Sequence, residues 1–460
     1  MFRGKVGTIH FVGIGGIGMS GIAEVLLNLG YVVTGSDLRE GESVRRLRGL
    51  GATVHIGHAQ EHVGEVDVVV RSTAVKEDNP EVVEASRKGV PVIRRAEMLA
   101  ELMRLKYGLA VAGTHGKTTT TSMLATCCGA GGLDPTVVIG GRLDNLGGTN
   151  AKLGAGDYLV AEADESDGSF MLLSPTVAVV TNIDAEHLDH YGTMEALEST
   201  FADFVNKVPF YGFVVLCIDH PRVQALLPKV RRRVVTYGFA SQADYRIRSV
   251  AYEGECSRFV LHHEGESLGE IALGMPGQHN VANAAAAAAA SHQLSIPFAA
   301  IQSALDGFSG VQRRFTVVGE REGVLYVDDY GHHPVEIEAT LGAACEGYPD
   351  RRVVAVFQPH RFTRVRDLWV EFCSCFNRAD RVIVCPVYAA GEAPIEGVDH
   401  ERLAQEIRDR GHRSVWSVDS LEGAVALLAK ESAEGDLVIS LGAGSVNQVV
   451  HQLWQGSGDR

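Results

Sequence analysis

The stretch AVAGTHGKTTTTSM, residues 110–123, says more about the fold than any other part of the chain. The apolar run that ends at Gly113 is typical of a buried strand, and the residues after Gly116 are typical of a helix that stops at glycines. Such a turn directs backbone N–H groups and the positive end of the helix dipole at one point, which suits a phosphate. The strict phosphate-loop pattern has glycine where this chain has Val111, so an ordinary strand–helix turn is the alternative.

Within this loop, Lys117 is expected to contact the β- and γ-phosphates of a nucleotide, and the Thr118 hydroxyl is expected to bind Mg²⁺. The phosphate-binding residues predicted from the pattern are Gly113, Thr114, His115, Gly116, Lys117, Thr118 and Thr119.

The length of 460 residues is too great for one core, and short apolar runs alternate with helical patterns along the chain. This alternation indicates parallel α/β architecture. We predict three domains: residues 1–105 form an N-terminal Rossmann-like domain, and 106–309 form a central P-loop ATPase with a parallel sheet. A small β insertion is expected near 230–275, and residues 310–460 form a C-terminal Rossmann-like domain.

The first domain contains HFVGIGGIGMSG, in which Gly13, Gly15 and Gly18 follow a predicted strand. Asp37 comes 19 residues after Gly18, so the pattern fits a dinucleotide fingerprint with Asp37 on a ribose. By itself the motif indicates a phosphate at a helix N-terminus without saying which ligand carries it. Glycines used only for tight packing are the alternative.

Two candidate metal ligands follow strands of the central domain. Glu162 ends the strand in DYLVAEADES, and His187 lies in TNIDAEHLDHYG after the next strand. The carboxyl ends of parallel strands lie on the ligand side, near the lysine loop. Glu162, His187 and Thr118 are therefore predicted to hold Mg²⁺ on a triphosphate, although imidazole is a less usual ligand for Mg²⁺. Taken singly, each residue could instead be a surface acid or a structural histidine.

The third domain has polar clusters at two strand ends, in YVDDYGHHP and FQPHRFTRVRDL. They are expected to meet at one mouth, where an arginine pair would suit a carboxylate. A solvated basic loop is the alternative. The residues concerned are Asp329, His332, His360, Arg361 and Arg364.

Composition excludes some classes of function. The formal charge of −15 argues against nucleic-acid binding, and no apolar run reaches the length of a membrane span. The N-terminus has no separate signal segment, and the eight cysteines lack zinc-ligand spacing. We therefore expect a cytoplasmic protein with reduced, buried thiols.

In chain order, the motifs resemble those of the Mur ligases over nearly the whole length. The segments are HFVGIGGIGMSGIAE, GTHGKTTTTSM, EADESDGSF, TNIDAEHLDHYG, GQHNVANA, GVQRRF, DDYGHHPVEI and FQPHRFTRVRDLW. The glycine motif together with DDYGHHP and FQPHR is typical of the alanine-adding members and of a close relative that recycles peptides. One departure is visible, because Arg71-Ser72-Thr73-Ala74 stands where Ser-Ser-Ala is usual.

The resemblance implies an ATP- and Mg²⁺-dependent ligase that joins L-alanine to the carboxylate of UDP-N-acetylmuramate in peptidoglycan synthesis. The alternative substrate is a recycled tripeptide. UDP-N-acetylmuramate would contact Gly15, Gly16, Ile17, Gly18, Asp37 and Ser72. ATP would also contact His279, Asn280, Asn283, Arg314 and Asp329, and the amino acid would contact His332, His360, Arg361 and Arg364. Catalysis would involve Lys117, Glu162, His187, Arg314, Asp329 and His332.

Two other classes of protein account for part of the pattern. A nicotinamide-dependent oxidoreductase would use the glycine motif but would leave the lysine loop without a role. A nucleotide-driven switch or motor would use the lysine loop but not the arginines and histidines of the third domain.

Overall fold

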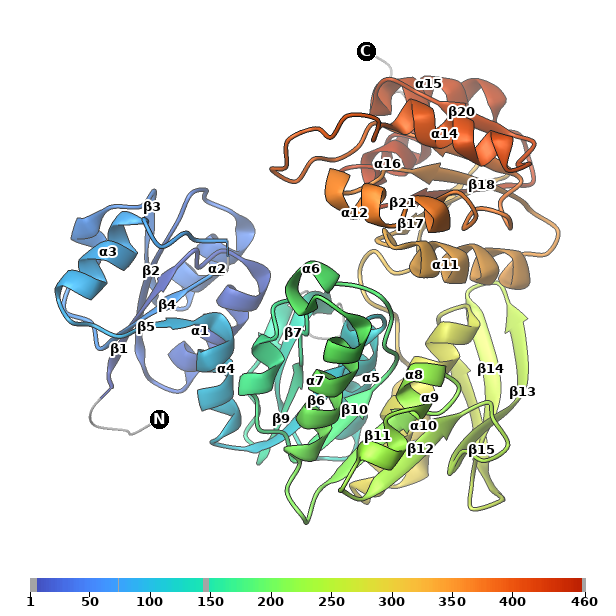
Figure 1. Ribbon diagram of the computed structural model, residues 1–460. Coiled ribbons are helices and arrows are strands. Elements are labelled where there is room, and N and C mark those ends of the chain that lie inside the picture. The colour runs from blue at the N-terminus through green and yellow to red at the C-terminus, as the bar shows by residue number, and fades with distance from the viewer. Residues whose placement is uncertain (1–5, 73, 144–148, 457–460) are drawn as a thin grey trace. The chain divides into compact units, whose positions relative to one another are not determined.

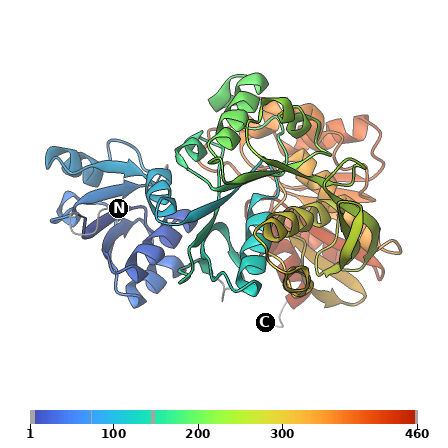
Figure 2. The same cartoon turned by 90° about the horizontal axis from the view of Figure 1, so that it is seen from below.

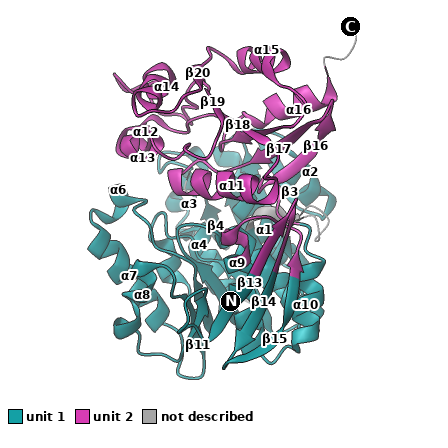
Figure 3. Cartoon of the chain, turned by 90° about the vertical axis from the view of Figure 1, so that its right-hand side faces the viewer, with its two compact units in different colours: residues 1–249, 259–271, 282–309 teal, residues 250–258, 272–281, 310–460 magenta. Residues whose placement is uncertain are grey.

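Three separate sheets carry the fold of the computed structural model, which describes residues 6–72, 74–143 and 149–456 (Figure 1). The predicted α/β fold with three sheets is confirmed. Contacts within the chain define two compact units (Figure 3). One comprises residues 1–249, 259–271 and 282–309, and the other comprises 250–258, 272–281 and 310–460. The predicted domain boundaries stay predictions.

The N-terminal sheet has five parallel strands in the order β3-β2-β1-β4-β5. Its strand order reverses between β1 and β4, and ligands of open α/β sheets bind at such a reversal. The strands are β1 (Thr8–Val12), β2 (Val32–Asp37), β3 (Thr53–Ile56), β4 (Val68–Arg71) and β5 (Val92–Arg94). The helices are α1 (Ile17–Asn28), α2 (Glu42–Gly49), α3 (Pro80–Arg87) and α4 (Arg95–Met103).

The central sheet has ten strands in the order β15-β14-β13-β12-β11-β10-β6-β9-β7-β8. The predicted β insertion is confirmed as β13–β15, and it extends this sheet rather than forming a separate one. Strand β8 pairs antiparallel with β7, so the sheet is mixed. Helices cover both faces (Figure 2). The strands are β6 (Tyr107–Ala112), β7 (Thr136–Leu143), β8 (Thr149–Lys152), β9 (Tyr158–Glu162), β10 (Val177–Val180), β11 (Phe213–Cys217), β12 (Val234–Gly238), β13 (Tyr245–Glu253), β14 (Cys256–His263) and β15 (Glu266–Leu273). The helices are α5 (Lys117–Ala130), α6 (Leu188–Tyr191), α7 (Met194–Asn206), α8 (Pro221–Gln224), α9 (Gln278–Gln293) and α10 (Phe298–Asp306).

The C-terminal sheet has the order β16-β17-β21-β18-β19-β20, and every pair except β16–β17 is parallel. Along β18, Val353, Ala355 and Phe357 belong to one buried cluster, whereas Val354 and Val356 belong to another. Both faces are therefore buried, as a doubly wound sheet requires. The strands are β16 (Thr316–Arg321), β17 (Val324–Asp329), β18 (Arg352–Phe357), β19 (Arg381–Val384), β20 (Val415–Ser417) and β21 (Asp436–Leu441). The helices are α11 (Pro334–Gly347), α12 (Phe362–Asp367), α13 (Trp369–Phe372), α14 (His400–Asp409), α15 (Leu421–Glu431) and α16 (Asn447–Gln455).

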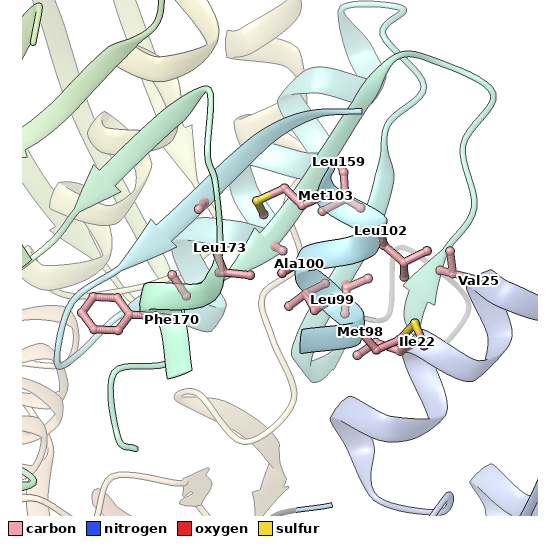
Figure 4. Close-up of a cluster of buried hydrophobic side chains, with 14 of the residues drawn as sticks. Ile22, Val25, Met98, Leu99, Ala100, Leu102, Met103, Leu159, Phe170 and Leu173 are labelled. Atoms are coloured by element: carbon pink, nitrogen blue, oxygen red, sulfur yellow. The ribbon is translucent and has the colours of Figure 1, made fainter. Parts of the chain in front are cut away.

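Helix α4 ends the N-terminal segment and contributes to a core that continues into the central segment (Figure 4). Met98 and Leu102 lie beside residues of α1, and Leu99 belongs to the same buried cluster as Phe170 and Leu173. Burying side chains of this size stabilises a fold by about 1.5–3 kcal/mol each. The first two sheets therefore share buried apolar surface within one unit.

The eight cysteines are all free, and six of them are buried. Burial raises the pKa of the Cys127 thiol to about 12, which disfavours the reactive thiolate.

Among the described residues, no helix is both long and apolar enough to cross a lipid bilayer.

A buried carboxylate, Glu81, joins three elements of the N-terminal unit. It accepts hydrogen bonds from His10 at 3.2 Å, from Ser36 at 2.5 Å and from His62 at 2.8 Å. Burial alone would raise the pKa of Glu81, but bonds from these three donors outweigh it and lower the pKa to about 2. The carboxylate is therefore charged at every pH above the acid range.

We predict that Glu81→Leu will destabilise this sheet by about 3 kcal/mol, because buried donors without an acceptor cost about 1–3 kcal/mol each. The folded-state pKa of about 2 lies below the ordinary value of 4.5. The contribution of Glu81 to the free energy of unfolding should therefore be complete above about pH 5 and should be lost as the pH falls from about 4.5 to about 2. Hydrogen exchange of the β1 and β2 amides between pH 2 and 7 measures this free energy. Glu61→Leu, at an exposed position nearby, is the matched control. An identical acid dependence in Glu81→Leu and wild type would contradict the prediction.

Candidate functional site

The lysine loop follows β6, near the middle of the central sheet between β9 and β10. Helix α5 begins at Lys117, and Gly116 caps it with φ of 80°. The predicted strand, glycine turn and helix are thus confirmed, and the first turn of α5 has its N–H groups at the carboxyl edge of the sheet.

The loop that follows β10 holds the lysine loop in place. Thr114 N donates to Asn182 O at 3.1 Å, and His115 N donates to Asn182 Oδ1 at 2.7 Å. Asp184 N donates to Thr114 Oγ1 at 2.8 Å, and the Asp184 carboxylate lies 3.2 Å from His115 Nε2. Burial alone would raise the pKa of Asp184, but hydrogen bonds from His115 and His220 outweigh it and lower the pKa. These supporting residues were not predicted from the sequence, although TNID lies within the segment TNIDAEHLDHYG that contains His187.

Lys117 makes an ion pair that the sequence analysis also missed. Its Nζ lies 2.9 Å from Glu165 Oε1, and both side chains are largely buried. Burial alone would lower the pKa of Lys117, but Glu165 and Asp164 outweigh it and raise the pKa, so the ammonium stays charged. Burial outweighs the attraction of Lys117 and raises the pKa of Glu165 to about 7.

The three predicted metal ligands come from neighbouring elements. Glu162 is the last residue of β9 and is paired in register with Val111 of β6. Thr118 lies in the first turn of α5, and His187 caps α6 after β10 with φ of 58°. A hydroxyl and a carboxylate suit Mg²⁺, whereas imidazole suits it less well. Their metal-binding role stays a prediction.

Asn283, which lies on α9, contacts the lysine loop. Thr120 Oγ1 lies 3.1 Å from Asn283 Oδ1, and a Cβ at Gly116 would lie only 2.5 Å from the same oxygen. This places Asn283 directly against the start of α5. Its predicted contact with the adenine stays a prediction.

The predicted nucleotide-sugar residues line two separate spaces. An open cleft of about 650 Å³ is lined by Gly15, Gly16, Asp37 and Ser72 at the strand-order reversal. The Asp37 carboxylate accepts a bond from Gly15 N at 2.8 Å, so it holds the glycine turn. His58 and Lys76 also line this cleft, and the sequence analysis missed both.

Gly18 instead lines a cavity of about 80 Å³, together with Arg95, Glu162, Asp164 and Ser169. Arg95 Nη2 lies 3.6 Å from the Asp164 carboxylate. The remaining predicted residue, Ile17, begins α1 and is 46% exposed. The glycine turn of the first sheet and the carboxylates after β9 thus share one cavity within the first unit.

In the second unit, Asp329 ends β17 and is buried. Its two oxygens accept bonds from Phe315 N at 2.7 Å and from Gly331 N at 2.6 Å. Burial raises the pKa of Asp329 to about 6, although nearby Arg314 lowers it. Arg314 Nη1 donates to Glu336 Oε1 at 3.3 Å.

His279 and Asn280 belong to the same unit. Burial and the Arg314 charge lower the pKa of His279 to about 4, and the Asn280 amide donates to Pro276 O at 2.8 Å. The predicted contacts of His279, Asn280, Arg314 and Asp329 with a nucleotide stay predictions.

The structure brings together the predicted amino-acid residues after β17 and β18. The His332 and His360 ring centroids lie 5.7 Å apart, and Arg364 Nη1 lies 3.5 Å from His360 Nδ1. Tyr388, which the sequence analysis missed, stacks on His360 with centroids 5.4 Å apart, and its carbonyl accepts a bond from Arg361 N at 2.9 Å. Burial, His332 and Arg364 lower the pKa of His360 to about 4, so this ring is neutral at pH 7.

Three β-sheets with helices packed against them, together with a loop that suits phosphate and carries a buried lysine, are typical of a nucleotide-dependent α/β enzyme. Family models match residues 8–107 as the Mur ligase family catalytic domain, 111–291 as the Mur ligase middle domain, and 313–444 as the Mur ligase glutamate ligase domain. The chain belongs to the Mur ligase family.

Individual relatives match over nearly the full length. UDP-N-acetylmuramate–L-alanine ligase from Geobacter sulfurreducens is 58% identical over 446 residues, which cover 97% of this chain and 96% of the relative. The crystal structure of UDP-N-acetylmuramate–alanine ligase from Thermotoga maritima has a TM-score of 0.81 at 30% identity, covering 97% of this chain and 98% of that one. A murein peptide ligase from Psychrobacter arcticus shares the fold, with a TM-score of 0.69 at 24% identity over 97% of this chain and 98% of that one.

We predict that Gly116→Ala will weaken ATP binding at least about tenfold. The new Cβ would clash with Asn283 Oδ1 and would occupy a φ of 80° that L side chains rarely adopt. Gly132→Ala is a matched control after the other end of α5, because Gly132 has φ of 76° and no atom within 4 Å of the new Cβ. Calorimetric titration with ATP measures both variants. Equal affinities of Gly116→Ala and wild type would contradict this role of the turn.

Proposed function

We propose that this chain catalyses ATP-dependent ligation of L-alanine to the carboxylate of UDP-N-acetylmuramate, a step of peptidoglycan precursor synthesis that takes place in the cytoplasm. The observation that carries the proposal is the cavity in which Gly18 of the nucleotide-sugar turn meets Glu162 beside the lysine loop. Relatives of the same length and 58% identity with this activity in their names support the choice of substrates.

The chemistry follows from the low reactivity of a carboxylate. At neutral pH a carboxylate does not condense with an amine, so it must first be activated. We propose that the muramate carboxylate attacks the γ-phosphorus of ATP, which gives an acyl phosphate and ADP. The alanine amine then attacks the acyl carbon, and inorganic phosphate leaves. Lys117 offsets the negative charge that develops on the transferred group.

The donor set after β6 and β9 fits Mg²⁺ through the Thr118 hydroxyl and the Glu162 carboxylate, with His187 as the third predicted ligand. When bound, Mg²⁺ supplies positive charge beside the triphosphate. We expect Glu162→Ala to raise the Mg²⁺ concentration required for half-maximal rate, measured as phosphate release across a Mg²⁺ titration. An unchanged Mg²⁺ requirement would remove Glu162 from the metal site.

The cluster formed by His332, His360, Arg361, Arg364 and Tyr388 is proposed to receive the amino acid. A guanidinium fork matches a carboxylate in two hydrogen bonds, which an ammonium cannot do. His360 is neutral and contacts Tyr388 and Arg364, so the arginines are the cations of this cluster.

The decisive test is a competition between L-alanine and the tripeptide L-alanyl-γ-D-glutamyl-meso-diaminopimelate, with ATP and UDP-N-acetylmuramate present. Preferential formation of the alanine product is expected, and phosphate release should require all three substrates. Preferential ligation of the tripeptide would overturn the choice of amine but leave the ligase chemistry intact.

In the same assay, Arg361→Lys should raise KM for alanine at least about tenfold, because the bidentate contact is lost. Arg366→Lys, an exposed arginine of the same helix region that pairs with Asp367, is the matched control. Equal KM values in the two variants would exclude Arg361 from the alanine site.

A further inference from the structure

All three N–H donors of the Lys117 ammonium are used within the chain. Nζ donates to Gly113 O at 2.7 Å, to Thr114 O at 3.1 Å and to Glu165 Oε1 at 2.9 Å. A lysine ammonium has only three such donors. A phosphate oxygen can therefore bind Lys117 only by replacing one of these three acceptors.

The two carbonyl acceptors belong to a loop that is itself fixed. Thr114 and His115 are hydrogen-bonded to Asn182, and a Cβ at Gly113 would lie 2.1 Å from Thr181 Oγ1. Moving these carbonyls would break the contacts that shape the loop. The hydrogen bonds from Lys117 to these two carbonyls are therefore the ones of its three that a phosphate would replace least readily.

Within the described residues, the Glu165 carboxylate has a single hydrogen-bond donor, the Lys117 ammonium. Tyr191 donates to the main-chain oxygen of Glu165 at 2.5 Å, which fixes the backbone but not the carboxylate. Its Oε2 is buried and finds no hydrogen-bond donor in the described part of the chain. Lys117 is thus the group that holds this carboxylate, which makes Glu165 the exchangeable partner.

We propose that Glu165 is a positioning residue that holds Lys117 against the phosphate-binding loop, and that the incoming β- or γ-phosphate replaces it on the ammonium. The proposal rests on the proposed function in one respect, because it takes ATP as the ligand of the loop. In this arrangement an acidic group faces the Lys117 ammonium until a phosphate replaces it, whereas a lysine buried without a counter-charge would be costly. The carboxylate and the triphosphate compete for one cation.

The test compares binding of ATP, ADP and AMP to wild type and Glu165→Gln by calorimetric titration at one fixed Mg²⁺ concentration. A neutral amide is a weaker competitor than a carboxylate, so Glu165→Gln should bind ATP about fivefold more tightly. AMP lacks the β- and γ-phosphates that reach Lys117, so its affinity should not change. A purely structural effect on the loop would change AMP and ATP affinity alike.

Three further variants make the result specific. In a Lys117→Ala background, Glu165→Gln should give no gain in ATP affinity, because the cation for which the groups compete is absent. Asp164→Asn removes a negative charge that faces Arg95 at 3.6 Å and also acts on Lys117, but Asp164 occupies none of the three hydrogen-bonding positions of the ammonium. Its gain in ATP affinity should therefore be smaller than that of Glu165→Gln. Glu165→Met, an uncharged side chain of similar volume, repeats the test if Glu165→Gln does not fold.

ATP affinity that is unchanged or weaker in Glu165→Gln would overturn the proposal. So would a gain that persists without Lys117, or an equal gain in Asp164→Asn. The alanine ligation assay on wild type is independent of these results. Failure to ligate alanine with the predicted affinity pattern intact would overturn the proposed substrates and leave the role of Glu165 standing.

Discussion

The hydrogen bonds between the loops after β6 and β10 are the contacts on which the central site depends. Ala112 and Val180 are partners in the parallel register, so the two loops leave the sheet side by side. Asn182 then bonds to the backbone of Thr114 and His115, and Thr181 occupies the space beside Gly113. The loop therefore takes its shape from a neighbouring strand as well as from its own glycines.

The same topological reason places the other polar clusters. In the first sheet the cleft lies where strand order reverses between β1 and β4, with Gly15 after one strand and Ser72 after the other. In the C-terminal sheet His332 and His360 follow β17 and β18, whose carboxyl ends lie on either side of β21. Side chains far apart in sequence meet at these edges because parallel strands end on the same side.

This explains which parts of the site could be predicted from the sequence. A strand that ends in a glycine turn fixes its loop locally, so Lys117 and the glycine motif near Gly15 were recognisable from spacing. The meeting of His332, His360 and Arg364 could be predicted because both of their segments follow the ends of parallel strands. The antiparallel strand β8 and the way β13–β15 extend the central sheet depend on pairing between distant segments, which local patterns do not encode.

Contacts made by single side chains were the hardest to foresee. The Asp37 carboxylate accepts a bond from Gly15 N, a contact that was not predicted, whereas its expected contact with a ribose stays a prediction. Both oxygens of Asp329 accept backbone N–H bonds, and the side chain is buried. These two hydrogen bonds hold the turn after β17 in place. Burial raises the pKa of the Asp329 carboxyl. His332 differs from Asp329, because its side chain is 17% exposed and lies next to the His360 ring.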